Sequence, residues 1–487
     1  MKGTCILNKK KGFFEFTESE LNITLDFTAE KYKDFIDKYY DNKEKNDLNQ
    51  QQIIKCIDDN NNKIYFYDLY GRPIRYKYPG FSFHKPLRVN LTFLPSFYIN
   101  ALGIKVNIKY ISISFKFDEL DYFVNPRRFY KPENYSFWDE DDKQWVIKAS
   151  QGTERIFKVI YYGEDIAIEF HPQVYETLFV NTPFKFTSYI SVEFSEPKSP
   201  DEIYKFILQL NSFFNILFDR QNIIIDEITL KENKVDVANL STLFIIKRIN
   251  NKRFKNEQEK KKVIPLELIE NSLEKAFQQY FSNTHIYLGY LREHEEDNIV
   301  SPAKFLMNTS TFEALFNEIY PEYVIEHSKE VEAFFSELKK FLNEYEGGKR
   351  VKKRIKEIEE YISSKSRKSL EDRMKKAFED FPFLLCVIDK SINITKDMDE
   401  YINYVNVVIQ RICDTRNIFA HGKKEFYDIG IYISDYLLLR IINLTLLLSY
   451  LGFDRSIIIK SISTLHELYI DEKLIDTYKQ RLHLSKK

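Results

Sequence analysis

The chain has 487 residues, of which 44% are hydrophobic, so it is long enough for about three domains with sizeable cores. Its 72 Lys and Arg residues nearly balance its 73 Asp and Glu residues, which excludes a polycation that binds nucleic acid along its whole length. A nucleic-acid site would therefore be a local basic patch. Aromatic residues reach 16%, which codon usage in an AT-rich genome explains better than aromatic platforms for stacked bases.

Cysteine usage and hydropathy both indicate the cytoplasm. The chain has four cysteines that lie far apart in the sequence: Cys5, Cys56, Cys386 and Cys413. Without a Cys-x-x-Cys pair they predict neither a disulfide framework nor a zinc knuckle. No N-terminal apolar segment resembles a signal peptide. The most apolar run, Tyr436 to Tyr450, contains Arg440 and Asn443, which favours a buried core helix over a membrane span.

The first part of the chain has the pattern of a β-rich domain. Runs of β-branched and aromatic residues, separated by polar or Gly/Pro turns, predict strands at 22–27, 63–67, 89–93, 106–117, 156–162, 166–170, 184–194 and 223–230. Many short strands with polar turns predict an antiparallel sandwich or a barrel-like domain. His84 and His171 are isolated here, which is typical of plain hydrogen-bonding residues and not of metal ligands.

A helix interrupts the predicted strands after residue 199, and from Pro265 onward the chain is almost wholly helical. Ser199-Pro200-Asp201 marks the start of a first helix. Helices are predicted at 200–218, 266–281, 302–320, 328–345, 349–362, 370–378, 399–421, 431–451 and 472–484. The Lys- and Arg-rich stretch 247–262 is either a solvated connector or an RNA contact. The fold class is therefore α+β multidomain, with a β-rich N-terminal regulatory domain at 1–230, a helical connector at 231–300 and an all-α bundle at 301–487.

One long predicted helix ends in the segment Arg416-Asn417-Ile418-Phe419-Ala420-His421-Gly422. An apolar stripe of four residues leads into this segment: Ile402, Val405, Ile409 and Ile412. At helical spacing, Arg416 takes the next inward position. Because a buried charge is costly unless it is paired or used, Arg416 and His421 are the first candidates for chemistry.

The Arg-Asn-x3-His-Gly pattern resembles the signature of the HEPN superfamily, helical domains of which many are metal-independent endoribonucleases. The resemblance extends to two neighbouring helical segments and to the apolar helix after the histidine. The two segments are Phe312-Glu313-Ala314-Leu315-Phe316 and Leu370-Glu371-Asp372-Arg373-Met374. A strand-rich first half joined to such a helical half is similar to the ApeA-type anti-phage proteins. The resemblance covers roughly the whole chain and is most specific at the motif.

The resemblance implies RNA cleavage by the 2′-hydroxyl, which needs no metal-activated water. His421 would transfer protons, since an imidazole titrates near neutral pH, and Arg416 would hold the phosphate oxygens. Asn417 would hold a phosphate oxygen or orient the histidine, and Glu313 would pair with Arg416 and fix its rotamer. The expected products carry a 2′,3′-cyclic phosphate and a 5′-hydroxyl. No metal or other cofactor is expected.

Five residues at about 100° each place Arg416 and His421 roughly 140° apart on an ideal helix. Either the helix frays near Gly422 or two copies of the motif build one site. HEPN nucleases generally do the second, so we expect an obligate homodimer with a composite active site. Five basic residues are candidates for RNA binding: Lys423, Lys424, Lys352, Lys353 and Arg373.

The overall prediction is a cytoplasmic abortive-infection protein whose helical domain cleaves RNA, with tRNA as the expected substrate. The N-terminal domain would sense a phage-derived trigger or restrain the nuclease, and no membrane partner is expected. Three alternatives remain open. Arg416 and Glu313 can form a purely structural ion pair, the helical domain can be a non-catalytic HEPN scaffold that binds nucleotides or a partner protein, or the chain can be a metal-dependent nuclease. The last lacks clustered Asp, Glu and His ligands in the sequence.

Overall fold

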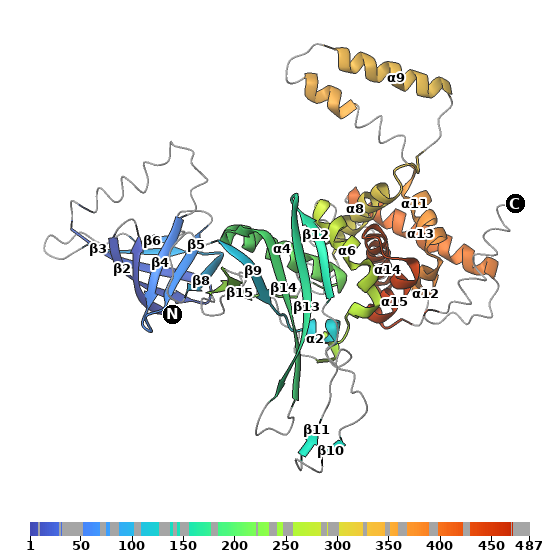
Figure 1. The fold of residues 1–487 in the computed structure, drawn as a ribbon. Helices are drawn as coiled ribbons and strands as arrows, with labels where there is room; N and C mark the ends of the chain where they lie inside the picture. Colours follow the sequence, from blue (N-terminus) through green and yellow to red (C-terminus); the bar gives the residue numbers. More distant parts are fainter. Residues whose placement is uncertain are drawn as a thin grey trace. The chain divides into compact units, whose positions relative to one another are not determined.

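The structure is a computed structural model of the 487-residue chain (Figure 1). The residues that it describes are 1–7, 10–28, 31, 52–68, 75–77, 87–101, 109–125, 137–139, 144–146, 155–176, 184–220, 223–232, 241–246, 257–283, 290, 301–324, 329–345, 351–358, 368–388, 398–421, 429–468 and 470.

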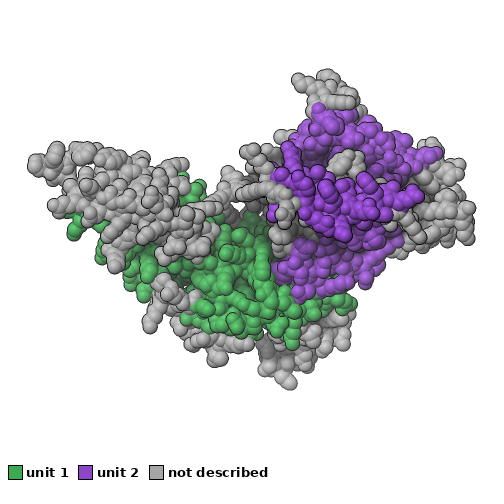
Figure 2. Space-filling model, turned by 90° about the horizontal axis from the view of Figure 1, so that it is seen from above, with its two compact units in different colours: residues 1–215, 222–274 green, residues 216–221, 275–487 purple. Residues whose placement is uncertain are grey.

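The chain divides into two compact units, which Figure 2 shows in different colours. The first comprises Met1–Asn215 and Asn222–Glu274, and the second comprises Ile216–Gln221 and Lys275–Lys487. The first unit is rich in strands and the second is helical, which confirms the α+β fold class. The three-part division with boundaries at residues 230 and 300 stays a prediction.

An antiparallel sheet dominates the first unit. Its fourteen described strands follow the order β12-β13-β14-β9-β15-β16-β8-β5-β4-β1-β2-β3-β7-β6. Their bounds are β1 Lys2–Leu7, β2 Lys10–Thr17, β3 Glu20–Phe27, β4 Gln52–Asp58, β5 Lys63–Asp68, β6 Arg75–Lys77, β7 Leu87–Phe93, β8 Phe97–Ala101, β9 Tyr110–Phe115, β12 Arg155–Tyr161, β13 Glu164–Glu176, β14 Phe184–Lys198, β15 Glu227–Lys231 and β16 Ser241–Ile245. A separate hairpin pairs β10 Phe137–Asp139 with β11 Gln144–Val146. Eight of the described strands were not predicted from the sequence: β1, β2, β4, β6, β8, β10, β11 and β16.

The part of the sheet that contains β1 to β5 curls around its own core. Phe16 on β2 and Phe66 on β5 have ring centroids 5.1 Å apart, although β1 and β4 lie between these strands in the sheet order. Three interstrand steps along a flat sheet would span about 14 Å, so the sheet must bend for the rings to meet. Strand β3 buries alternate residues, Leu21 to Phe27, toward this core. This half of the sheet is therefore barrel-like, as predicted.

Helix α4, Pro200–Leu217, covers the other half of the sheet. The ring of Phe206 contacts Tyr161 on β12 at 5.0 Å and Phe194 on β14 at 5.6 Å. The predicted helix start is confirmed, because Ser199 donates its backbone N–H and its hydroxyl to the Glu202 carboxylate at 2.8 and 2.6 Å. This reciprocal cap satisfies polar groups that a helix N-terminus leaves open. His171 on β13 is a hydrogen-bonding residue with Ser191, at 2.6 Å, and His84 lies outside the described residues.

The second unit consists of helices. The described helices of the whole chain are α2 Leu120–Val124, α4, α5 Glu257–Lys260, α6 Leu266–Ser282, α8 Pro302–Ile319, α9 Lys329–Glu344, α11 Leu370–Asp380, α12 Leu385–Ile388, α13 Met398–Ala420, α14 Ile429–Tyr450 and α15 Arg455–His466, with a further helical segment at 351–358 and a 3-10 turn at Pro382–Leu384. Helix α8 packs against α11, α13 and α14. The sequence analysis missed α15, and the helix that it predicted at 472–484 lies outside the described residues.

Helix α14 is the one described helix that is long and apolar enough to cross a membrane, yet 67% of its Gly430–Tyr450 window is buried inside the protein. Asn443, a buried polar residue of this helix, has a partner there. The amide of Asn443 donates to the backbone carbonyl of Asn308 on α8 at 2.9 Å. Because buried polar groups need hydrogen bonds, this pairing fixes α14 against α8 as a core helix. The burial fits a soluble protein, and the cytoplasmic location stays a prediction.

Candidate active site on helices α8, α11 and α13

The buried stripe of α13 brings the motif to the edge of the helical core. Val405, Ile409 and Ile412 are buried, and the side chain of Ile402 lies outside those that the structure describes. The side chain of Arg416 is 38% exposed, so the prediction of a fully inward arginine is corrected. Four residues advance a helix by about 40° beyond a full turn, which moves Arg416 from the centre of the stripe to its border. The guanidinium is thus held by the protein and open to solvent.

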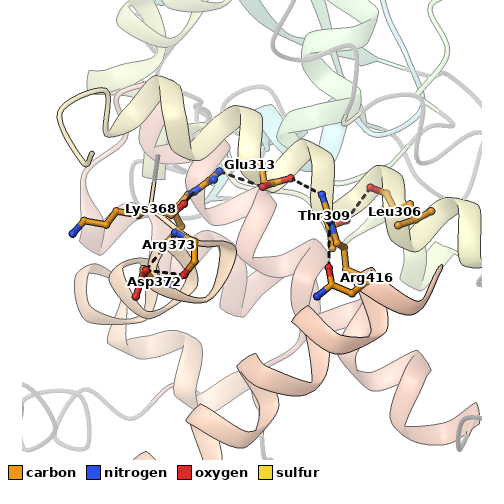
Figure 3. Close-up of polar contacts among 9 residues, drawn as sticks. Leu306, Thr309, Glu313, Lys368, Asp372, Arg373 and Arg416 are labelled. Atoms are coloured by element: carbon orange, nitrogen blue, oxygen red, sulfur yellow. Dashed lines mark hydrogen bonds and ion pairs between the residues drawn. The ribbon is translucent and has the colours of Figure 1, made fainter. Parts of the chain in front are cut away.

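Glu313 on α8 pairs with Arg416, as the sequence predicts. Its Oε2 lies 3.7 Å from Nη2 of Arg416, and its Oε1 lies 3.4 Å from Nη1 of Arg373 on α11. Figure 3 shows the carboxylate between these two guanidinium groups. The N-terminus of α8 is fixed by Ser301, whose hydroxyl accepts a hydrogen bond from the Lys304 N–H. Three helices therefore converge on one carboxylate.

The predicted exposure of Arg373 is wrong. This residue was predicted on an exposed basic face, but it is 7% exposed. Its Nε donates to the backbone carbonyl of Lys368 at 2.9 Å, and Ser369 and Asp372 form a capping box that starts α11. A signal for this was present, because Arg373 lies four residues before the buried Ala377, on the same face of the helix. The burial favours a positioning role over the predicted RNA contact.

Asn417 and His421 lie at the exposed C-terminal end of α13. The Asn417 Oδ1 accepts a hydrogen bond from Nη1 of Arg416 at 3.4 Å. The N–H of His421 donates to the Asn417 carbonyl at 3.1 Å, so helical bonding continues to the histidine. Among the described residues, the His421 side chain has no hydrogen bond or ion pair, and none joins it to Arg416. The large angular offset expected between the two side chains is therefore not removed by fraying before residue 421.

An aromatic cluster anchors this end of α13. Phe419 has its ring centroid 5.7 Å from that of Phe305 on α8 and 5.5 Å from that of Tyr432 on α14. Edge-on aromatic pairs of this kind add about 1 kcal/mol beyond the burial of their area. The cluster fixes the turn that carries His421 against two other helices.

Arg411 and Cys413, which precede Arg416 on α13, are structural residues. Arg411 donates from Nε and Nη2 to both oxygens of Asp435 on α14, at 2.6 and 2.5 Å. Burial raises the pKa of Asp435, and Arg411 opposes this by lowering it. Burial also raises the pKa of the Cys413 thiol to about 11, and nearby Glu371 and Asp414 add to the increase. Cys413 is therefore a protonated thiol at neutral pH and not a nucleophile.

Four further residues were predicted to bind RNA: Lys352, Lys353, Lys423 and Lys424. Lys352 and Lys353 are exposed on the helical segment 351–358. Lys423 and Lys424 lie outside the described residues, as does Gly422. The predicted basic face is interrupted on α11, where Lys375 pairs with Glu371 at 2.5 Å and Lys376 pairs with Asp380 at 2.8 Å.

In the described ranges, no group of three or more His, Cys, Asp or Glu side chains is arranged to hold a metal ion.

The family comparisons agree with this fold. The Apea-like HEPN family model matches residues 306–457, a range that contains Glu313, Arg373, Arg416 and His421. The helical unit thus defines a HEPN protein, a class whose domains are generally nuclease-like. The family model of ApeA N-terminal domain 1 matches residues 8–280, which is more than half of the chain. The chain belongs to the ApeA-type HEPN proteins, and its two domains indicate an anti-phage HEPN protein. The searches found no similar curated protein and no similar solved structure.

Proposed function

We propose that this protein is a metal-independent endoribonuclease of an abortive-infection defence, with its active site at Arg416 and His421. The 2′-oxygen of RNA attacks the adjacent phosphorus, the O2′–P bond forms and the P–O5′ bond breaks. The products are a 2′,3′-cyclic phosphate and a 5′-hydroxyl. His421 transfers the proton, and Arg416 stabilises the charge that develops on the phosphate oxygens.

The observation that carries this proposal is the half-exposed guanidinium of Arg416, tethered on its inner side by Glu313. Arg411, the structural arginine of the same helix, is 30% exposed but commits its guanidinium to Asp435 in two hydrogen bonds. Arg416 instead keeps one contact to Glu313 at 3.7 Å and one to Asn417 at 3.4 Å, and no other polar contact of its guanidinium is found within the described part of the chain. A planar guanidinium binds two phosphate oxygens at once, so the open side suits an RNA phosphate.

A homodimer supplies the second half of the site in this proposal. Helical bonding through His421 supports a large offset between its side chain and that of Arg416. A two-fold axis would bring Arg416 and His421 of one protomer against those of its partner, so that one imidazole accepts the 2′ proton and the other protonates the O5′ leaving group. Tyr404 and Val407 on the exposed side of α13 would be partly covered by such a partner.

The substrate and the regulation belong to the same proposal. Structured host RNA, with tRNA as the first candidate, would be cleaved after infection, which halts growth. The β-rich N-terminal domain would sense a phage-derived trigger or restrain the nuclease. Lys352 and Lys353 on the exposed segment 351–358, together with Lys423 and Lys424, would contact the RNA backbone.

The test compares purified wild-type protein with His421→Ala on total RNA, with and without EDTA, followed by mapping of the cut ends. We expect cleavage by the wild type in EDTA, 5′-hydroxyl ends, and loss of about 10²- to 10⁴-fold in the variant, the usual contribution of a general acid or base. Cleavage that EDTA abolishes would instead indicate a metal-dependent nuclease. Nucleotide binding without cleavage would indicate a non-catalytic HEPN scaffold.

A further inference from the structure

The carboxylate of Glu313 is shared between two guanidinium groups of very different exposure. Arg373 is almost fully buried, whereas Arg416 is half-exposed. In the described residues these two arginines are the cations paired with Glu313. Both contacts, at 3.4 and 3.7 Å, are longer than the 2.7–2.9 Å or so of a charge-assisted hydrogen bond. Neither arginine therefore forms a close, charge-assisted hydrogen bond with the Glu313 carboxylate.

Arg373 is the fixed member of this arrangement. Its Nε is bound to the Lys368 carbonyl at 2.9 Å, and the capping box of Ser369 and Asp372 holds the same turn. A buried guanidinium whose Nε is already bound, on a helix turn that is itself capped, loses little further freedom when it pairs with Glu313. The position of the carboxylate is thus set from the interior of the bundle, on the side away from solvent.

The charges explain what this geometry does for Arg416. A half-buried carboxylate with a single cationic partner would draw that partner into a close pair, because charge pairs strengthen as water is excluded. The close pair would have to break before Arg416 could bind a phosphate. With Arg373 supplying part of the compensating charge, Glu313 orients Arg416 without capturing it.

We propose that Arg373 is a positioning residue that acts through Glu313 and keeps the Arg416 guanidinium available to an RNA phosphate. This inference rests on the proposed nuclease function. It assigns Arg373 a part in substrate affinity although its side chain is buried away from the RNA. It also gives Glu313 two separate duties, orientation of Arg416 and neutralisation of Arg373.

A double-mutant cycle tests the proposal. Arg373→Gln, Glu313→Gln and the double variant are compared with the wild type for kcat and KM on bulk tRNA and for thermal unfolding. Arg373→Gln leaves Glu313 with Arg416 as its one cation, so we expect KM to rise about tenfold, within the usual coupling range of contacting residues. Glu313→Gln removes the orienting group, so we expect kcat to fall about tenfold. The double variant should have the kcat and KM of Glu313→Gln alone.

The controls separate positioning from folding. Arg373→Lys keeps the charge beside Glu313 and should keep KM within about threefold of the wild type. Arg411→Gln breaks the other arginine–carboxylate pair, that with Asp435, and should lower thermal stability without raising KM. A tenfold rise in KM that persists when Arg373→Gln is added to Glu313→Gln would overturn the proposal, because Arg373 would not act through the carboxylate.

Two further outcomes are decisive. If Arg373→Gln folds and has wild-type KM, or if both Arg373→Gln and Arg373→Lys fail to fold, Arg373 serves the fold alone and the proposal is overturned. The same assay includes His421→Ala. Absence of His421-dependent cleavage in the wild type would reject the proposed nuclease function. His421-dependent cleavage with an inert Arg373→Gln change rejects the positioning role only.

Discussion

Helix α13 carries two arginine–carboxylate pairs that are five residues apart and differ in geometry. Arg411 makes two hydrogen bonds, at 2.6 and 2.5 Å, with Asp435, whose side chain is 4% exposed. Arg416 has one contact with Glu313, at 3.7 Å, and the Glu313 side chain is 27% exposed. The two arginines themselves are exposed to similar extents, 30% for Arg411 and 38% for Arg416. The two pairs have the same chemistry, but the first is closed to ligands and the second is open.

The two pairs of α13 therefore suit different roles, one in stabilising the helix and one in binding a ligand. A bidentate pair with a buried carboxylate has no oxygen left for exchange, so displacing it would leave a desolvated charge. A looser pair at the border of the core can share its guanidinium with an incoming phosphate. The tight pair near Arg411 fixes α13 to α14, and this fixed helix then presents the loose pair.

The largest expected effect comes from Arg416→Ala. Removing a group that stabilises transition-state charge typically costs about 10²- to 10³-fold in kcat, and substitutions at exposed positions change stability by about 0.5 kcal/mol or less. We therefore expect near-complete loss of RNA cleavage and of growth arrest with an unchanged melting curve. RNA cleavage assays measure the loss of activity, and thermal unfolding measures the stability. If Arg416→Ala is destabilised but keeps its activity per folded molecule, the Arg416 pair is structural, like the Arg411 pair.

Arg411→Met should give the opposite result. It leaves the Asp435 carboxylate buried without its partner, and breaking a buried pair in this way costs about 3 kcal/mol. Chemical denaturation should show this loss in the free energy of unfolding, while the folded fraction keeps its cleavage rate. Equal stability of Arg411→Met and the wild type would show that the tight pair adds nothing to the fold.

The stability of Arg411→Met should also depend on pH in a defined direction. Burial already raises the pKa of Asp435, and Arg411 is the group that lowers it, so the variant should have a still higher folded-state pKa. A carboxyl whose pKa is higher in the folded state binds more protons when folded. Stability therefore rises as pH falls through the folded pKa, and above it the penalty is about 1.4 kcal/mol for each unit of pKa difference. Denaturation of variant and wild type at pH 8 and pH 5.5 should show the deficit shrinking at the lower pH.

The sequence predicted the elements of the site better than its connections. The long helix, the Arg416–Glu313 pair and the β-rich first half follow from periodicity, motif spacing and family resemblance, and the structure contains them. The burial of Arg373 was missed because a run of Lys and Arg residues suggests a solvated face. Its spacing of four residues from Ala377 would have placed it inward.

Long-range pairings could not be predicted for a different reason. The contact of Arg411 with Asp435 depends on how α13 and α14 cross, which no local pattern encodes. The same holds for the curl that brings Phe16 to Phe66. Strand β1 was missed because its burial pattern is irregular, with Cys5 and Leu7 buried at one end only. Tertiary packing determines such features and overrides the local strand propensity of the sequence.

The smallest effect is expected from Cys413→Ala, which tests whether the buried residues between the two pairs belong to the site. Cys413 lies one turn before Arg416 and is 9% exposed. With its pKa raised to about 11, the thiol is protonated at neutral pH and takes no part in catalysis. Loss of its sulfur should cost about 1 kcal/mol in unfolding free energy through the small cavity left behind. Cleavage should stay within about twofold of the wild type, and an alkylating reagent at pH 7.5 should leave the folded protein active. If the reagent inactivates the wild type but not Cys413→Ala, the Cys413 thiol is accessible and belongs to the site.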